Sequence, residues 1–197
     1  MVCYNVASMK TNTKLYETCA ALLASGKGIL AADESDGTAG KRLDMVGLEN
    51  TPENRQDFRE ILFTAPEIEK YISGVIMYDS SIKNSTDDGT PFADVLTARG
   101  IIPGIKVDRG VRDHHGFKGE VITQGLDDLD ARLAEYHELG ARFAKWRMVV
   151  TIDGDDTPTY ETVKMNCLMM ARYAQLCQAA GIVPMVEPEV IFAGDHS

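Results

Sequence analysis

Short apolar runs alternate with helix-like patterns along this chain of 197 residues, and this alternation limits its fold more than any other feature. The apolar runs cover residues 28–32, 74–78, 101–107, 142–150 and 182–186. Apolar residues recur at helical spacing in the segments that separate most of them, namely 15–26, 51–66, 126–140 and 163–181. Because parallel neighbours need a crossover between them, the alternation predicts an α/β protein with a mostly parallel sheet.

Charged residues stand in or just after each strand-like run and favour one of two sheet architectures. They are Asp33, Asp79, Lys106, Asp108, Lys145, Arg147, Glu187 and Glu189. Barrel enzymes carry catalytic groups at the C-terminal ends of several strands, whereas a doubly wound nucleotide binder has a glycine-rich turn after its first strand. The sequence Gly26-Lys27-Gly28 precedes the first run and does not match that turn. We therefore predict a (β/α)₈ TIM barrel.

The run 142–150 carries two cations on one face. Residues i and i+2 of a strand point the same way, so Lys145 and Arg147 share a face with Phe143 and Val149. If this face is the packed interior of a barrel, both cations need a partner or a bound anion. The solvent face of an edge strand, where they need neither, is the alternative.

Glu187 and Glu189 follow the last apolar run and share a face by the same rule. Pro188 between them has no N–H, which predicts a sheet edge, a bulge or the end of a strand. Two close carboxylates repel each other, which raises the pKa of one and leaves an acid beside a base. A solvated turn is the alternative interpretation.

The segment 30–42 brings hydroxyl groups and a flexible backbone close to a helix start. Asp33 ends the apolar run, and Ser35, Gly37 and Thr38 follow it. Such a segment suits phosphate, although helix capping explains Asp33 equally well. Lys106 is a further candidate phosphate contact, with a surface lysine as the alternative.

Composition excludes several classes of protein. The net charge of −10 argues against nucleic acid as a partner, although a local pocket of Lys and Arg is compatible with a small anion. No stretch approaches the ~18 apolar residues of a membrane span, and residues 1–14 hold no signal-peptide run. The four cysteines form no CxxC pair, and the four histidines lack the spacing of a zinc site. We expect no metal, no cofactor, no membrane and a cytoplasmic setting.

Five segments together resemble the class I fructose-bisphosphate aldolase family: LAADES, GIKVD, TQGLDDL, FAKWR and GIVPMVEPEV. They occur in the family's order and spacing, and the similarity extends from about Leu15 to the final GDH. The resemblance implies a cofactor-free lyase of glycolysis that cleaves fructose 1,6-bisphosphate to dihydroxyacetone phosphate and glyceraldehyde 3-phosphate. A lysine attacks the ketone in that reaction, and the protonated imine (Schiff base) is the electron sink.

The resemblance implies catalytic roles for four residues. Asp33 looks like the family's proton-transfer carboxylate near the bond that breaks. Lys145 resembles the lysine that stabilises developing charge and helps the imine to form. Glu187 resembles the acid/base of carbinolamine dehydration, with Glu189 as its electrostatic neighbour.

The resemblance also implies five substrate-binding residues for the phosphorylated sugar. Lys106 looks like a contact to substrate oxygens, and Arg147 looks like a cation that positions the substrate. Ser35, Thr38 and Arg42 fall in the region that is similar to the family's binding site for one substrate phosphate.

The chain ends at Ser197, just past the fifth strand-like run. The family's Schiff-base lysine belongs to the sixth strand, and a complete barrel typically needs ~250 residues. We therefore expect residues 1–197 to form a single domain, an incomplete barrel of about the first five β/α units that is poorly stable and inactive alone. Full-length family members are usually tetramers. A metal-dependent barrel enzyme, and a truncated remnant that acts as a binding or interaction protein, are the alternatives.

Overall fold

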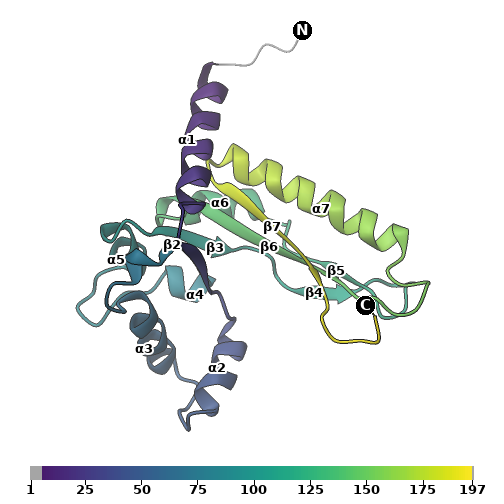
Figure 1. Ribbon diagram of the computed structural model, residues 1–197, viewed down its shortest axis with the longest axis horizontal. Coiled ribbons are helices and arrows are strands. Elements are labelled where there is room, and N and C mark those ends of the chain that lie inside the picture. The colour runs from purple at the N-terminus through teal and green to yellow at the C-terminus, as the bar shows by residue number, and fades with distance from the viewer. Residues whose placement is uncertain (1–5, 197) are drawn as a thin grey trace.

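The computed structural model describes residues 6–196 and contains a curled, open sheet of five parallel strands (Figure 1). In order across the sheet these are β1 (Gly28–Ala32), β2 (Ile72–Met77), β3 (Ile102–Lys106), β6 (Phe143–Val150) and β7 (Val183–Val190). Each strand pairs in parallel with the next one in this order. The predicted α/β architecture is confirmed, and the sheet curls into half of a barrel.

Helix α1 (Val6–Leu22) precedes the first strand, and the other helices lie in the connections that follow the strands. These other helices are α2 (Asp36–Asp44), α3 (Pro52–Phe63), the 3-10 helix η1 (Ile68–Lys70), α4 (Asp79–Ile82), α5 (Phe92–Ala98), α6 (Leu129–Glu138) and α7 (Tyr160–Ala179). Helix α7 runs beside β6 and β7 (Figure 1). Strands β4 (Val111–Asp113) and β5 (Val121–Thr123) form a separate antiparallel hairpin. The sequence patterns predict α1, α3, α6 and α7, but not α2, α4, α5 or the hairpin.

Side-chain caps fix where two of the helices begin. The Thr51 hydroxyl accepts a hydrogen bond from the Asn54 N–H at 3.1 Å, which confirms the predicted start of α3. The Ser35 hydroxyl accepts from the Thr38 N–H at 3.3 Å and starts α2 immediately after β1. This short connection keeps Asp33, Ser35 and Thr38 together at the C-terminal end of β1.

The outer face of the sheet packs against helices in the main hydrophobic core. Ala144 and Trp146 of β6 are fully buried there together with Tyr173 of α7. The Tyr173 hydroxyl donates to the carbonyl of Ala144 at 2.5 Å and lies 3.2 Å from that of Met185. One buried hydroxyl therefore ties α7 to both β6 and β7.

The inner face of β6 changes from apolar to charged along the strand. Phe143 is fully buried in a small cluster with Leu22 of α1 and Ile76 of β2. Gly104 of β3 leaves the space that this ring fills, because a Cβ at Gly104 would lie 2.3 Å from it. The next side chain on the same face is Lys145.

Strand β7 is longer than the run 182–186 that the sequence predicts. It continues to Val190, so a strand end at Pro188 is wrong and the sheet-edge alternative is correct for residues 6–196. Val183 and Ile191 donate their backbone N–H groups to carbonyls of the β6 segment. Because strand residues alternate, the nitrogen of Pro188 faces away from β6, and no ladder bond is lost.

Candidate functional site

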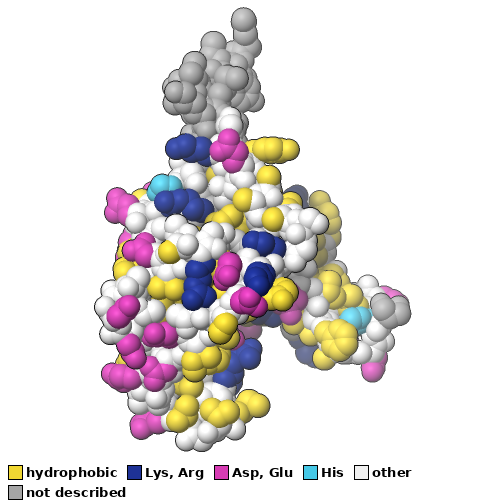
Figure 2. All heavy atoms as spheres, turned by 60° about the vertical axis from the view of Figure 1, so that its left-hand side comes forward, with side chains coloured by type: hydrophobic (Ala, Val, Ile, Leu, Met, Phe, Trp, Pro, Cys, Tyr) yellow, Lys and Arg dark blue, Asp and Glu magenta, His cyan; other side chains and the backbone are white. Residues whose placement is uncertain are grey.

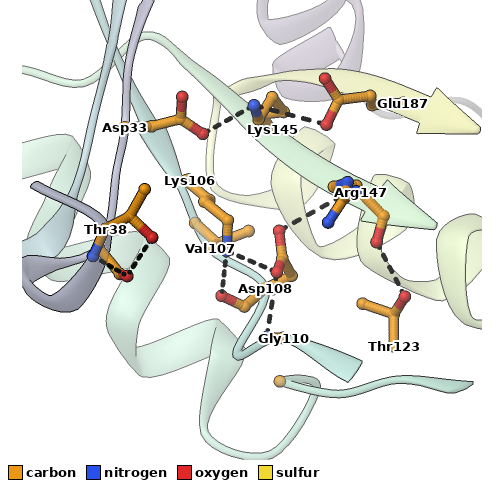
Figure 3. A network of polar contacts seen from close by, with 12 residues as sticks. Asp33, Thr38, Lys106, Val107, Asp108, Gly110, Thr123, Lys145, Arg147 and Glu187 are labelled. Atoms are coloured by element: carbon orange, nitrogen blue, oxygen red, sulfur yellow. Dashed lines mark hydrogen bonds and ion pairs between the residues drawn. The ribbon is translucent and has the colours of Figure 1, made fainter. Parts of the chain in front are cut away.

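A cavity of about 830 Å³ lies at the C-terminal ends of the strands. Eight of the nine site residues predicted from the sequence line it. They are Asp33, Ser35, Thr38, Lys106, Lys145, Arg147, Glu187 and Glu189. The strand-end convergence on which the sequence interpretation depends is therefore present, and Figure 3 shows its central contacts.

Lys145 lies between two carboxylates at the floor of the cavity (Figure 3). Its Nζ is 2.7 Å from Oδ2 of Asp33 and 3.4 Å from Oε2 of Glu187. The second contact is long, and Oε2 of Glu187 accepts no hydrogen bond from the described residues, so we treat it as an ion pair. The Lys145 and Asp33 side chains are only 9% and 10% exposed.

This arrangement keeps Lys145 protonated. Burial alone lowers the pKa of an ammonium group, but the hydrogen bond to Asp33 and the charges of Asp33 and Glu187 outweigh it, so the pKa of Lys145 is raised. Lys145 is therefore a fixed positive charge at neutral pH. A lysine nucleophile must instead be an uncharged amine, so Lys145 is unsuited to that role.

Arg147 and Glu189 form the next ion pair on the same face. The Arg147 Nε–H donates to Oε2 of Glu189. This hydrogen bond and the arginine charge lower the pKa of the Glu189 carboxyl. The sequence suggests that repulsion between Glu187 and Glu189 raises one pKa, whereas the structure gives each carboxylate its own cation.

Lys106 and Asp108 form a third pair at the end of β3. The Lys106 Nζ donates to Oδ1 of Asp108 at 2.6 Å and lies 3.1 Å from the Asp108 carbonyl oxygen. The Asp108 side chain is 2% exposed, whereas that of Lys106 reaches the cavity. The sequence places Asp108 after a strand but assigns it no role.

Of the three residues predicted to bind phosphate, two line the cavity and the third lies outside it. Ser35 and Thr38 line the cavity with their hydroxyl oxygens 3.1 Å apart. Arg42 is not among the lining residues, and its Nε lies 3.0 Å from Oε1 of Glu34. Arg59 holds the other Glu34 oxygen at 2.6 Å. Burial raises the pKa of the Glu34 carboxyl, but the hydrogen bonds from Arg59 and the backbone, together with the charges of Arg59 and Arg42, outweigh it, so this pKa is lowered. Arg42 thus reaches this site only through Glu34.

The sequence of this chain also matches a known protein family. The family model for class-I fructose-bisphosphate aldolase matches residues 14–197. This chain belongs to that family. Aldolases of this family are lyases.

Similar proteins include bacterial and animal aldolases. A probable class 1 fructose-bisphosphate aldolase of Xanthomonas axonopodis pv. citri is 55% identical over 183 residues, which are 93% of this chain and 54% of that protein. The fructose-bisphosphate aldolase of Drosophila melanogaster is 50% identical over 194 residues, which are 98% of this chain and 54% of that protein. This chain thus spans about half the length of the curated relatives that it matches.

A solved aldolase structure matches the fold. It is the Plasmodium falciparum fructose-bisphosphate aldolase, in complex with TRAP and a small-molecule inhibitor, with a TM-score of 0.93 and 43% sequence identity. The match covers 95% of this chain and 55% of that one. The five-stranded sheet is accordingly an incomplete TIM barrel of the aldolase type.

A second polar group on the cavity wall was not predicted from the sequence. The Tyr136 hydroxyl donates to Oδ1 of Asp79 at 2.8 Å, and Lys83 lies within 3.0 Å of both Asp79 and Glu135. Burial, followed by the bond to Asp79, raises the pKa of Tyr136 to about 12. In the sequence Tyr136 fits the apolar face of a helix, so only the strand-end position of Asp79 signals this group.

Residues 6–196 show neither a metal-binding cluster nor a membrane-spanning helix. They contain no group of three or more His, Cys, Asp or Glu side chains placed to hold a metal ion. No helix in the described part of the chain is long and apolar enough to cross a membrane. On the face in Figure 2, basic and acidic side chains lie together near the middle, and acidic side chains gather along the lower left edge, in keeping with the net charge of −10.

Proposed function

We propose that this chain supplies the acid–base groups and substrate-binding cations of an aldolase site that cleaves fructose 1,6-bisphosphate to dihydroxyacetone phosphate and glyceraldehyde 3-phosphate. One observation carries the proposal. Lys145 is held as an ammonium ion between Asp33 and Glu187 at the floor of a cavity that Lys106 and Arg147 also line.

In the proposed reaction an imine lysine other than Lys145 withdraws electrons from the substrate. When the carbon–carbon bond breaks, its electron pair moves into the imine, and a carboxylate accepts the proton of the neighbouring hydroxyl. Asp33 takes this second role, because it is an acceptor already held at the cavity floor. Glu187 acts as the acid/base of carbinolamine dehydration, Glu189 as its electrostatic neighbour, and Lys145 stabilises developing negative charge.

The binding roles follow from charge. A bisphosphate needs fixed cations and hydroxyl donors, and Lys106, Arg147, Ser35 and Thr38 supply them around one cavity. Arg42 supports the same end of the site through Glu34. No metal or organic cofactor takes part in this proposal.

Titration calorimetry with fructose 1,6-bisphosphate, together with a coupled assay for dihydroxyacetone phosphate, tests the proposal. We expect the chain to bind the sugar and the variants Lys106→Met and Arg147→Met to bind it at least tenfold more weakly, since each loses a charged contact. The variant Lys118→Met removes an exposed lysine of the β4–β5 turn and is the matched control. Equal binding by all variants would refute the assignment.

Borohydride trapping tests the role of Lys145 separately. Reduction in the presence of dihydroxyacetone phosphate, followed by peptide mass spectrometry, should leave Lys145 unmodified, because a protonated amine does not attack a ketone. Lys106 should also stay unmodified, because the proposal assigns it to substrate binding. A specific adduct on either lysine would overturn the mechanism. Binding without turnover by residues 1–197 would favour the alternative of a non-catalytic binding protein for this chain alone.

We further propose a single domain, a place in glycolysis, a cytoplasmic location and a homotetramer for the full-length protein. A relative in Arabidopsis thaliana, 50% identical over 183 residues, is described as cytosolic, which supports the location. Fractionation of cells and light scattering of the full-length protein test the location and the tetramer.

A further inference from the structure

The backbone hydrogen bonds between β3 and β6 end at Lys145, before β6 reaches Arg147. The last pairing in the register is Lys106 with Lys145, and the Val107 N–H then donates to the Lys145 carbonyl at 3.1 Å. Strand β6 continues to Val150. Alternate residues of a strand turn their backbone polar groups to the same edge, so the next N–H and C=O on this edge belong to Arg147.

Two side chains take the place of the missing strand at Arg147 (Figure 3). Its N–H donates to Oδ2 of Asp108 at 3.3 Å. Its carbonyl accepts from the Thr123 hydroxyl of β5 at 2.8 Å. Both backbone groups of Arg147 are therefore held by side chains from outside the parallel sheet.

The same Asp108 carboxylate also holds Lys106. Its Oδ1 accepts from Lys106 Nζ at 2.6 Å and from the Gly110 N–H at 3.1 Å. With a side chain only 2% exposed, Asp108 is costly to bury unless these donors surround it, so its orientation is fixed by them. Each of its two oxygens is thus assigned to a different cation-bearing residue.

We propose that Asp108 is a positioning residue that sets the ammonium of Lys106 and the backbone of Arg147 in one fixed relation, and that Thr123 completes this brace. The inference rests on the proposed function for its substrate, since Lys106 and Arg147 are the cations assigned there to the sugar phosphate. It adds that their spacing is set by one buried carboxylate rather than by the sheet.

The variant Asp108→Asn isolates this role. Asparagine keeps the shape, but it has one oxygen and one NH₂ group, whereas the site offers N–H donors on both sides. In either orientation of the asparagine amide, its NH₂ group therefore faces an N–H donor: Lys106 and Gly110 on one side, or Arg147 on the other. We expect the affinity for fructose 1,6-bisphosphate to fall about tenfold and the Arg147 amide to exchange with solvent at least tenfold faster.

A double-mutant cycle with Lys106→Met separates positioning from a general structural effect. If Asp108 acts through Lys106, the loss of affinity in the double variant is smaller than the product of the two single losses. The control is Asp113→Asn, which removes an exposed carboxylate of β4 and should bind like the wild type. Losses that multiply, or an Asp108→Asn variant that binds normally, would overturn the proposal.

Two readouts keep the test decisive. Circular dichroism reports whether Asp108→Asn folds. If this variant does not fold, Thr123→Val replaces it in the test, because it leaves Asp108 and Lys106 intact. We expect Thr123→Val to bind the sugar severalfold more weakly than the wild type. Unchanged binding by Thr123→Val would then overturn the brace. If the wild type does not bind the sugar, the proposed function fails, and amide exchange at Arg147 in Asp108→Asn alone decides whether the brace exists.

Discussion

Replacing Lys145 by methionine removes the central charge of the site while keeping most of its apolar volume. At an effective dielectric constant of ~20, its attraction to Asp33 at 2.7 Å is about 6 kcal/mol before desolvation is subtracted. Removing one partner of a buried pair typically costs ~3–5 kcal/mol. We expect about 3 kcal/mol, because the adjoining cavity admits water to Asp33. For a chain of this size this corresponds to a fall in Tm of roughly 6–12 °C.

The pH dependence identifies the cause of that loss. Because the pKa of Lys145 is raised in the folded chain, its stabilising contribution is complete below the unfolded value of about 10.4 and disappears as the pH rises through the folded value. The difference in unfolding free energy between wild type and Lys145→Met should therefore shrink at alkaline pH.

Urea denaturation from neutral pH to about pH 11, followed by two spectroscopic probes to check two-state behaviour, measures this difference. Other lysines titrate in both proteins and cancel in the comparison. Lys118→Met is the control and should leave stability within ~0.5 kcal/mol of the wild type. A Lys145→Met chain as stable as the wild type, or a difference that does not change with pH, would refute the electrostatic argument.

Three further variants test other parts of the fold by urea denaturation. Gly104→Ala should cost about 2 kcal/mol, because its Cβ would meet the buried ring of Phe143 at 2.3 Å; an unchanged midpoint would contradict this packing. Tyr173→Phe should cost about 1 kcal/mol by removing the hydroxyl that joins β6 to β7, and no loss would mean that its hydrogen bonds are dispensable. Burial raises the pKa of Glu120, but the hydrogen bonds from Thr159 and Thr162, together with the charge of His114, outweigh it and the pKa is lowered. Glu120→Gln should therefore destabilise the chain at neutral pH, and progressively less in acid as the wild-type carboxylate is protonated. If the difference in unfolding free energy between wild type and Glu120→Gln stays constant across pH, the Glu120 carboxylate is not the cause.

The strands were more predictable than the helices that leave them. Short apolar runs identify β1, β2, β3 and β6 to within about two residues, because strands covered by helices in an α/β fold are mostly apolar. Helix α2 was missed because Gly37 and Gly40 lower its intrinsic helix propensity, and the Ser35 cap and packing against Asn50 are visible only in three dimensions. The hairpin of β4 and β5 has three residues in each strand, which is too short for a periodic pattern.

The site was predictable where it depends on alternation within one strand. The i, i+2 rule places Lys145 with Arg147 and Glu187 with Glu189, and all four line the cavity. Which cation pairs with which carboxylate was not predictable, because this depends on the register between β6 and β7. That register sets the backbone of Arg147 opposite the backbone of Glu187. The part played by Asp108 was hidden for the same reason, since its acceptors face residues of two strands.

The inner face of β6 places Lys145, to which we assign charge stabilisation, deeper than Arg147, to which we assign substrate binding. Along this face the exposed fraction rises from 0% at Phe143 to 9% for the Lys145 side chain and 38% for that of Arg147. Electrostatic interactions weaken as water approaches, so the strongest field is at Lys145, where two carboxylates converge on one ammonium. A proton transfer benefits from that fixed field, whereas a phosphate must enter and leave, and so a cation at the wetter level of Arg147 suits it better. Under the proposed function, a single strand thus holds its catalytic lysine deeper than its substrate-binding arginine, by the alternation of three odd-numbered residues.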